Sequence, residues 1–352
     1  MKLRTVAATI AAVSLLISTP AGAAELTPQQ LASADKATVK QYTNESVSPA
    51  WRDKIDNERV VEMWATSPSM NNREIPLVVI KAAHENRPTI YLLNGGDGGE
   101  GRANWVMQTD VIDFYKEKDV NVIIPMSGKF SYYTDWASEN EHLGGRQMWE
   151  TFLTKELPAT IEPMLKANNQ RAITGMSMSA TTSLLYAQHN PGFYDAVGSF
   201  SGCPGSSSPL GVLSIKLTLD RGKATPEQMW GPIGSEAWIY NDALTNAEKL
   251  RGTAVYVSNA TGLAGTWDLP GLSPRLQKLD PATASATSAA TIIEGGAIEA
   301  VTNACTHQLK TKLDSLGIPA DFNLRNTGTH SWGYWQDDLR GSWETFARAW
   351  GI

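Results

Sequence analysis

The sequence predicts an α/β fold, with a mostly parallel central sheet covered by helices on both faces. Short apolar segments alternate with helical patterns along most of the 352 residues, a spacing typical of repeated β-α-β units. A serine in Gly175-Met176-Ser177-Met178-Ser179 separates a predicted strand from a predicted helix, and His330 follows the last predicted strand. A serine that precedes its histidine, each placed after a strand, is the chain order of the α/β-hydrolase fold.

Eight short apolar segments predict the strands, at residues 60–66, 75–81, 89–93, 120–125, 172–176, 196–201, 254–259 and 320–325. Six segments with helical periodicity predict the helices, at residues 111–118, 148–166, 179–189, 241–250, 299–316 and 336–350. The first two strands have no helix between them, so we expect an antiparallel hairpin or edge there. Residues 204–240, rich in Gly, Pro and Trp, predict a lid-like insertion over the cleft. The Ala/Ser/Thr run 282–290 predicts a flexible loop.

The first 23 residues have the pattern of a secretory signal peptide. Lys2 and Arg4 give a positive start, residues 7–18 are apolar, and Ala21-Gly22-Ala23 is a small-residue cleavage site. The apolar stretch is too short for a membrane anchor. We therefore expect a protein that is exported.

The rest of the chain predicts one catalytic domain behind a short extension. Residues 24–56 are polar and partly helical in pattern, and we expect them to pack on the surface. Residues 57–352 contain all eight predicted strands and no convincing linker, so we assign them to a single α/β-hydrolase domain.

The charge balance and the residue spacing exclude several classes of partner. The formal net charge is -6, and removal of two positive charges with residues 1–23 makes it about -8. An acidic chain is a poor candidate for binding nucleic acid. No His or Cys cluster has metal-ligand spacing, and the Gly-rich stretch 95–101 lacks the Lys-Ser/Thr of a phosphate-binding loop. We expect a monomer with no metal and no cofactor.

The two cysteines, Cys203 and Cys305, are candidates for a disulfide. An even number of cysteines in an exported protein favours pairing. Both also fall near segments that we place beside the cleft. The alternative interpretation is two separate buried thiols.

Ser177 and His330 are the candidate nucleophile and base. Small residues around Ser177 fit a sharp strand-to-helix turn that exposes the hydroxyl, although Ser179 takes the place of the commoner glycine. His330 lies just after the last predicted strand, where this fold places its base. The remaining histidines precede the serine or lie in predicted helices: His84, His142, His189 and His307. We expect His189 to cap the end of helix 179–189, where a cation is favoured.

The acid and the oxyanion hole are less sharply defined by pattern alone. Asp268, Glu294 and Glu299 all lie between the penultimate strand and His330. Any of them could orient the imidazole, which is the task of the acid. One oxyanion donor should be the N–H of Met178, directly after the nucleophile. The other should come from the loop Asn94-Gly95-Gly96-Asp97, where glycines let the backbone approach a substrate.

Several longer runs resemble the antigen 85-type mycolyltransferase family of mycolic-acid bacteria. They are Tyr91-Leu92-Leu93-Asn94-Gly95, Phe130-Ser131-Tyr132-Tyr133-Thr134-Asp135-Trp136, Trp149-Glu150-Thr151-Phe152-Leu153-Thr154, Leu157-Pro158, the serine turn, Met229-Trp230-Gly231-Pro232, Asn241-Asp242 and Gly328-Thr329-His330-Ser331-Trp332-Gly333-Tyr334-Trp335. Their common order and similar spacing, over roughly residues 60–350, are more specific than the serine turn alone.

The resemblance implies an α/β-hydrolase that transfers a mycolyl group between trehalose esters or onto arabinogalactan. It implies a Ser-Glu-His triad, in which Ser177 and His330 match the nucleophile and base. Glu299, at the head of its predicted helix, matches the acid. Met178 matches one oxyanion donor, and Gly96 stands where the family has a leucine that supplies the other.

Two departures from the family bear on the substrate. Mycobacterial members carry Asp-Gly-Leu-Arg in the loop where this chain has Asn94-Gly95-Gly96-Asp97. The cysteines also lie elsewhere. The pattern suits a corynebacterial trehalose corynomycolyltransferase better than a mycobacterial enzyme.

We interpret the chain as a secreted acyltransferase that contacts the mycolate outer membrane peripherally. Asn94, Ser331 and Trp332 are candidate substrate-binding residues: Asn94 for a sugar hydroxyl and Trp332 as a platform for a sugar ring. Packing is the alternative role for Trp332. The alternative functions are a secreted carboxylesterase and a non-catalytic envelope protein built on the same fold.

Overall fold

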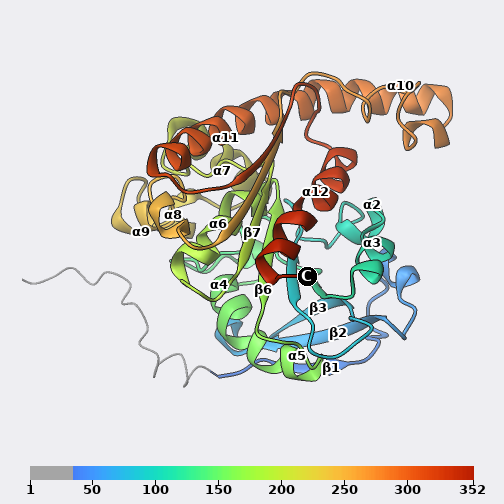
Figure 1. Cartoon of the computed structure of the whole chain (residues 1–352), viewed down its shortest axis with the longest axis vertical. Coiled ribbons are helices and arrows are strands. Elements are labelled where there is room, and N and C mark those ends of the chain that lie inside the picture. The colour runs from blue at the N-terminus through green and yellow to red at the C-terminus, as the bar shows by residue number, and fades with distance from the viewer. Residues whose placement is uncertain (1–34) are drawn as a thin grey trace, which may run out of the picture.

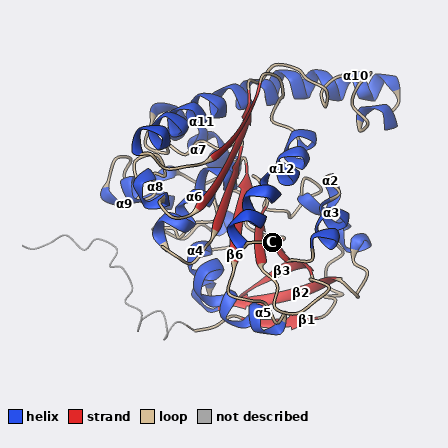
Figure 2. Cartoon of the chain, in the orientation of Figure 1, coloured by secondary structure: helices blue, strands red, loops and turns tan. Residues whose placement is uncertain are grey.

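A nine-stranded sheet forms the centre of the molecule (Figures 1 and 2). The computed structural model describes residues 35–352, so the predicted signal peptide lies outside the described residues. The strands follow the order β1-β2-β3-β5-β4-β6-β7-β8-β9. Their bounds are β1 Thr38–Gln41, β2 Val60–Ser67, β3 Arg73–Ile80, β4 Thr89–Leu93, β5 Asn121–Pro125, β6 Arg171–Met176, β7 Ala196–Phe200, β8 Ala254–Ala260 and β9 Asp321–Arg325.

The sheet is antiparallel at one edge and parallel elsewhere. Strands β1, β2 and β3 pair antiparallel in succession, and β3 pairs antiparallel with β5. All pairings from β5 to β9 are parallel. This topology confirms the predicted α/β-hydrolase fold, and the antiparallel β2–β3 pair confirms the predicted hairpin.

Helices cover both faces of the sheet and bury two separate hydrophobic clusters. In β4, Tyr91 and Leu93 belong to one cluster and Ile90 and Leu92 to the other, because successive side chains of a strand point to opposite faces. Helices α5, α6 and α11 pack on the first face, and α2, α3 and α12 on the second. The helix bounds are α2 Trp105–Gln108, α3 Val111–Lys118, α4 Trp149–Thr151, α5 Pro158–Met164, α6 Met178–His189, α7 Pro209–Arg221, α8 Pro226–Trp230, α9 Glu236–Tyr240, α10 Pro281–Ala290, α11 Gly296–Leu316 and α12 Trp332–Trp350.

The predicted N-terminal extension contributes a strand that the sequence analysis missed. Strand β1 pairs with β2 and lies at the sheet edge. Only Val39 of its four residues is buried, which leaves almost no apolar alternation to detect. A 3-10 helix, Ala50–Lys54, accounts for the helical pattern in the same extension.

The run 282–290 is a helix, so the prediction of a flexible loop is wrong. Helix α10 begins at Pro281, and Asp280 caps it by accepting hydrogen bonds from the N–H groups of Ala282 and Thr283. Proline in the first turn and alanine in the interior both favour helix. A π-helical turn, Thr291–Gly295, joins α10 to α11, and α10 projects from the body in Figure 1.

Two other predicted helices are shorter than expected. The segment 148–166 divides into α4, a π-helical turn Phe152–Glu156, and α5, with Pro158 at the junction. The segment 241–250 keeps only a 3-10 turn, Ala247–Leu250. There the Asp242 side chain accepts from the N–H groups of Ser207 and Thr245, which favours a turn.

The predicted lid-like insertion contains helices α7, α8 and α9. Cys203, the residue before the insertion, forms a disulfide with Cys305 of α11 across 102 residues of sequence. The disulfide joins the segment after β7 to the helix that carries Glu299. Among the described residues, no helix is long and apolar enough to cross a membrane.

We expect the disulfide to stabilise the fold. A cross-link over so long a loop restricts the unfolded chain, and losing one typically costs about 2–5 kcal/mol. A Cys203→Ser/Cys305→Ser variant should therefore unfold at lower guanidinium concentration than the oxidised wild type. A free energy of unfolding within about 0.5 kcal/mol of wild type would contradict this role.

Candidate active site

Ser177 lies in a strained turn between β6 and α6. Its backbone has φ 57° and ψ −118°, a conformation that few non-glycine residues adopt. Its N–H donates to the carbonyl of Phe200 in the neighbouring strand, at 2.9 Å. A Cβ at Gly175 would collide with Ser179, so the crowded turn requires glycine there.

Ser179 is compatible with this crowding because its hydroxyl forms hydrogen bonds with the backbone of the same turn. The side chain is fully buried, and its Oγ lies 3.0 Å from the N–H of Met176 and 3.1 Å from the Met176 carbonyl. These contacts tie the end of β6 to the start of α6. The departure from glycine therefore adds hydrogen bonds to the turn.

Ser177, His330 and Glu299 form one hydrogen-bonded line. Ser177 Oγ lies 2.7 Å from His330 Nε2, and His330 Nδ1 lies 2.8 Å from Glu299 Oε2. Glu299 is fully buried, whereas Ser177 is partly exposed. The loop that carries His330 is fixed by a hydrogen bond from its N–H to the Gly295 carbonyl, at 3.1 Å. A hydroxyl, an imidazole and a carboxylate in this order can activate the hydroxyl as a nucleophile.

The other two candidate acids have different positions. Glu294 is exposed on the π-helical turn. Asp268 is fully buried and accepts hydrogen bonds from the hydroxyls of Thr329 and Tyr334, at 2.6 and 2.7 Å. Thr329 precedes His330, so Asp268 anchors the histidine loop without touching the imidazole. Of the three candidates, Glu299 is the one that contacts His330.

The two candidate oxyanion donors lie in the segments that follow β6 and β4. Met178 is the first residue of α6, and N–H groups in the first turn of a helix have no acceptor within it. Gly96 lies in the loop after β4, and its carbonyl accepts from the N–H of Phe130 at 2.8 Å. β4 and β6 are neighbouring parallel strands, so both loops leave the same edge of the sheet.

Asn94 does not fit the predicted role of sugar ligand. Its side chain is fully buried; Nδ2 donates to the Pro125 carbonyl at 2.8 Å, and Oδ1 accepts from the Trp105 N–H at 3.1 Å. Both polar ends of the amide are therefore used to join β5 and α2 to the loop after β4. The prediction is wrong because a polar residue after a strand can bind the protein's own backbone as well as a ligand.

Trp332 and Ser331 lie next to His330, at the start of α12. The Trp332 ring is half-buried and packs edge-to-face against Trp105 and Trp335, with centroids 5.5 and 5.2 Å apart. These neighbours fix the orientation of the ring. Two neighbours of the triad were not predicted from the sequence: Trp335, whose ring packs against His330 itself, and Ser201, which contacts Glu299.

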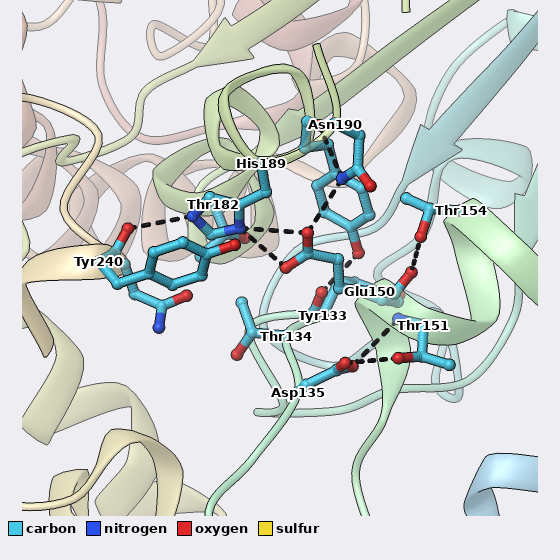
Figure 3. A network of polar contacts seen from close by, with 12 residues as sticks. Tyr133, Thr134, Asp135, Glu150, Thr151, Thr154, Thr182, His189, Asn190 and Tyr240 are labelled. Atoms are coloured by element: carbon cyan, nitrogen blue, oxygen red, sulfur yellow. Dashed lines mark hydrogen bonds and ion pairs between the residues drawn. The ribbon is translucent and has the colours of Figure 1, made fainter. Parts of the chain in front are cut away.

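His189 is the last residue of α6, as predicted, and its side chain also takes part in a polar network (Figure 3). Its Nδ1 lies 3.0 Å from Glu150, its Nε2 lies 3.0 Å from the Tyr240 carbonyl, and its ring stacks on Tyr240 at 3.9 Å. The imidazole side chain is 2% exposed. His189 therefore connects α4 and α6 to α9 of the insertion.

Asp135 belongs to the same region, where it accepts hydrogen bonds from the N–H and hydroxyl of Thr151 at 3.1 and 2.6 Å (Figure 3). Burial, together with the charge of Glu150, raises the pKa of Asp135 to about 6. Asp135, Glu150 and Thr151 all come from runs that resemble the mycolyltransferases. These three residues therefore lie in the polar network that reaches α9 of the insertion through His189.

Comparisons with known proteins identify the family of the chain. The esterase family model, described as "Putative esterase", matches residues 67–346. The chain is 30% identical over 295 residues to the diacylglycerol acyltransferase/mycolyltransferase Ag85A of Mycobacterium tuberculosis, covering 81% of this chain and 80% of the relative. It is also 30% identical over 259 residues to Ag85B of Mycobacterium leprae, covering 72% of this chain and 73% of the relative.

Solved structures are similar in fold at lower identity. MPT51 (FbpC1) of Mycobacterium tuberculosis aligns with a TM-score of 0.64 and 22% identity, over 80% of this chain and 96% of its own. An S-formylglutathione hydrolase from Agrobacterium tumefaciens aligns with a TM-score of 0.57 and 16% identity, over 82% of this chain and 95% of its own. Both support the α/β-hydrolase architecture.

The raised pKa of Asp135 predicts a pH-dependent contribution to stability. Since the pKa of Asp135 in the folded protein exceeds the ordinary aspartate pKa of 3.8, this contribution is complete below about pH 4 and is lost as the pH rises through about 6. Asp135→Asn keeps an acceptor and a donor for Thr151 and removes the titration. The free energy of unfolding should therefore fall less between pH 4 and pH 7 in the variant than in the wild type. Equal decreases, measured by denaturant titration, would contradict the assignment.

Proposed function

Because the chain belongs to the antigen 85-type mycolyltransferase family of esterases, we propose that it is a secreted acyltransferase of the cell envelope. It moves a mycolyl or corynomycolyl group from trehalose monomycolate to a second trehalose monomycolate or to arabinogalactan. The observation that carries this proposal is the hydrogen-bonded line from Ser177 through His330 to Glu299.

In the first half of the reaction, Ser177 Oγ attacks the ester carbonyl of the donor. His330 Nε2, at 2.7 Å, takes the hydroxyl proton. Glu299 holds the Nδ1 proton and stabilises the imidazolium. The N–H groups of Met178 and Gly96 hold the oxyanion, a contribution of about 3 kcal/mol for each donor. His330 then gives its proton to the departing trehalose oxygen, which leaves an ester on Ser177.

In the second half, a sugar hydroxyl attacks the ester on Ser177. His330 takes the proton of that hydroxyl and returns it to Ser177 Oγ as the acyl group leaves. The same residues would release a free acid if water attacked first, which is the reaction of a carboxylesterase. Trp332, held beside His330 by its aromatic neighbours, supports a site where a sugar ring can stack.

Exposed apolar side chains support contact between the protein and a lipid layer. Eleven of the fifteen exposed large apolar side chains in residues 35–352 lie in two segments, 209–240 and 263–298. The second segment ends one residue before Glu299. Its Gly295 carbonyl accepts the hydrogen bond from the N–H of His330. The first includes α7, which packs on α11 and whose Arg221 lies 5.7 Å from the ring of Phe130, next to Gly96. Both apolar segments therefore border the site that would receive the acyl chain.

We expect transfer to a sugar to exceed hydrolysis. Incubation with purified trehalose monomycolate should give trehalose dimycolate and free trehalose, measured by mass spectrometry. Ser177→Ala should abolish the products and also abolish labelling by a fluorophosphonate. Free mycolic acid as the sole acyl product would instead assign a carboxylesterase, and an unlabelled wild type would contradict the serine mechanism.

We expect the exposed leucines of α7 to contribute to binding of lipid. Leu213 and Leu217 are 50% and 59% exposed, and burying a leucine side chain gains about 1.5–3 kcal/mol. Leu213→Ser/Leu217→Ser should lower binding to phosphatidylcholine vesicles roughly ten-fold in a sedimentation assay. Met164→Ser is the matched control, because Met164 is 46% exposed on α5. An equal loss in both variants would contradict a specific lipid-facing surface.

A further inference from the structure

Ser201 holds the side of the Glu299 carboxylate that faces away from His330. It follows β7, is fully buried, and its Oγ lies 2.9 Å from Glu299 Oε1. The N–H of Ala260, at the end of β8, donates to the same oxygen at 2.8 Å. Both donors thus bind Oε1, and Oε2 remains for His330 Nδ1.

Trp335 contacts His330 directly and is linked to Glu299 through Ser201. Its Nε1–H donates to Ser201 Oγ at 3.1 Å. Its ring packs edge-to-face on His330, with centroids 4.9 Å apart and planes at 89°. Trp335 is itself buried behind Trp332.

The direction of these hydrogen bonds is fixed by chemistry. An indole N–H can only donate, and an ionised carboxylate can only accept. Ser201 Oγ therefore accepts from Trp335, and its single proton goes to Glu299. The chain of donors therefore ends on the carboxylate of Glu299.

The backbone of Ser201 adds a second, independent observation. Its φ is 57°, in the left-handed region that favours glycine. A serine in this conformation is strained, and such strain is concentrated at functional sites. Glycine would fit the backbone better but would lack the hydroxyl.

We propose that Ser201 and Trp335 are positioning residues for acyl transfer. They fix the rotamer of Glu299 and the plane of His330, so that Nδ1 keeps its proton and Nε2 faces Ser177. This inference rests on the proposed function, since it assumes that His330 acts as the base for Ser177. It adds two residues that touch neither the substrate nor the nucleophile.

The decisive variant is Ser201→Gly, which removes the hydroxyl and relieves the backbone strain. With a p-nitrophenyl ester as substrate, kcat should fall on the order of ten- to a hundred-fold, because small misplacements of catalytic groups have effects of that size. KM should stay within about two-fold, and the thermal unfolding midpoint should not decrease. Trp335→Phe, which removes the N–H and keeps a ring, should also lower kcat.

Ser199→Ala is the matched control. Ser199 lies in β7, two residues before Ser201; it is buried and donates to the Ala180 carbonyl instead of to Glu299. Its kcat should be near that of the wild type. Wild-type kcat in Ser201→Gly, or an equal loss in Ser199→Ala, would overturn the proposal.

A double-mutant cycle tests whether Ser201 acts through Glu299. In a Glu299→Gln background, Ser201→Gly should change kcat by less than about two-fold, since the carboxylate that it positions is already absent. A full additional loss would overturn the proposal. Ser177→Ala separates the two hypotheses: if it retains fluorophosphonate labelling, the proposed function fails, whereas a normal Ser201→Gly rate refutes only the positioning role.

Discussion

The buried carboxylate of Glu299 is the constraint on which the candidate site depends. An unpaired charge without solvent is very unfavourable, so the fold has to supply its partners. These come from three adjacent strands: Ser201 after β7, the N–H of Ala260 at the end of β8, and His330 after β9. Parallel strands end at one edge of a sheet. The order β7-β8-β9 therefore satisfies the carboxylate and, at the same time, directs His330 toward Ser177.

The parts of the molecule that follow from local chemistry could be predicted from the sequence. Strands buried on both faces appear as short apolar runs, and all eight predicted strands are present with small differences at their ends. The strained serine turn has its own pattern of small residues around Ser177. The position of His330 followed from chain order. The selection of Glu299 required the family resemblance, because three carboxylates occupied suitable positions in the sequence.

Other features depend on contacts between distant segments and gave no local signal. Asn94 follows a strand as a ligand would, yet its partners are backbone groups of β5 and α2. His189 ends a helix as a cap would, yet it pairs with Glu150 and contacts α9. Ser201 and Trp335 lie 134 residues apart, so only the assembled sheet brings them together. Helix α10 is a different case. Asp280-Pro281 is a helix N-terminal pattern that is visible in the sequence, but the Ala/Ser/Thr composition of the run after it favoured the prediction of a loop.

The Cys203–Cys305 disulfide affects the stage of folding at which the helix that carries Glu299 is fixed covalently. Thiols stay reduced in the cytoplasm and pair in oxidising compartments. Glu299 lies in α11, six residues before Cys305. If the chain is exported as proposed, packing alone would hold α11 in place until the chain has crossed the membrane. The covalent bond is then added outside, close to the acid itself. On that proposal, folding would have two stages, and the second would require an oxidising compartment.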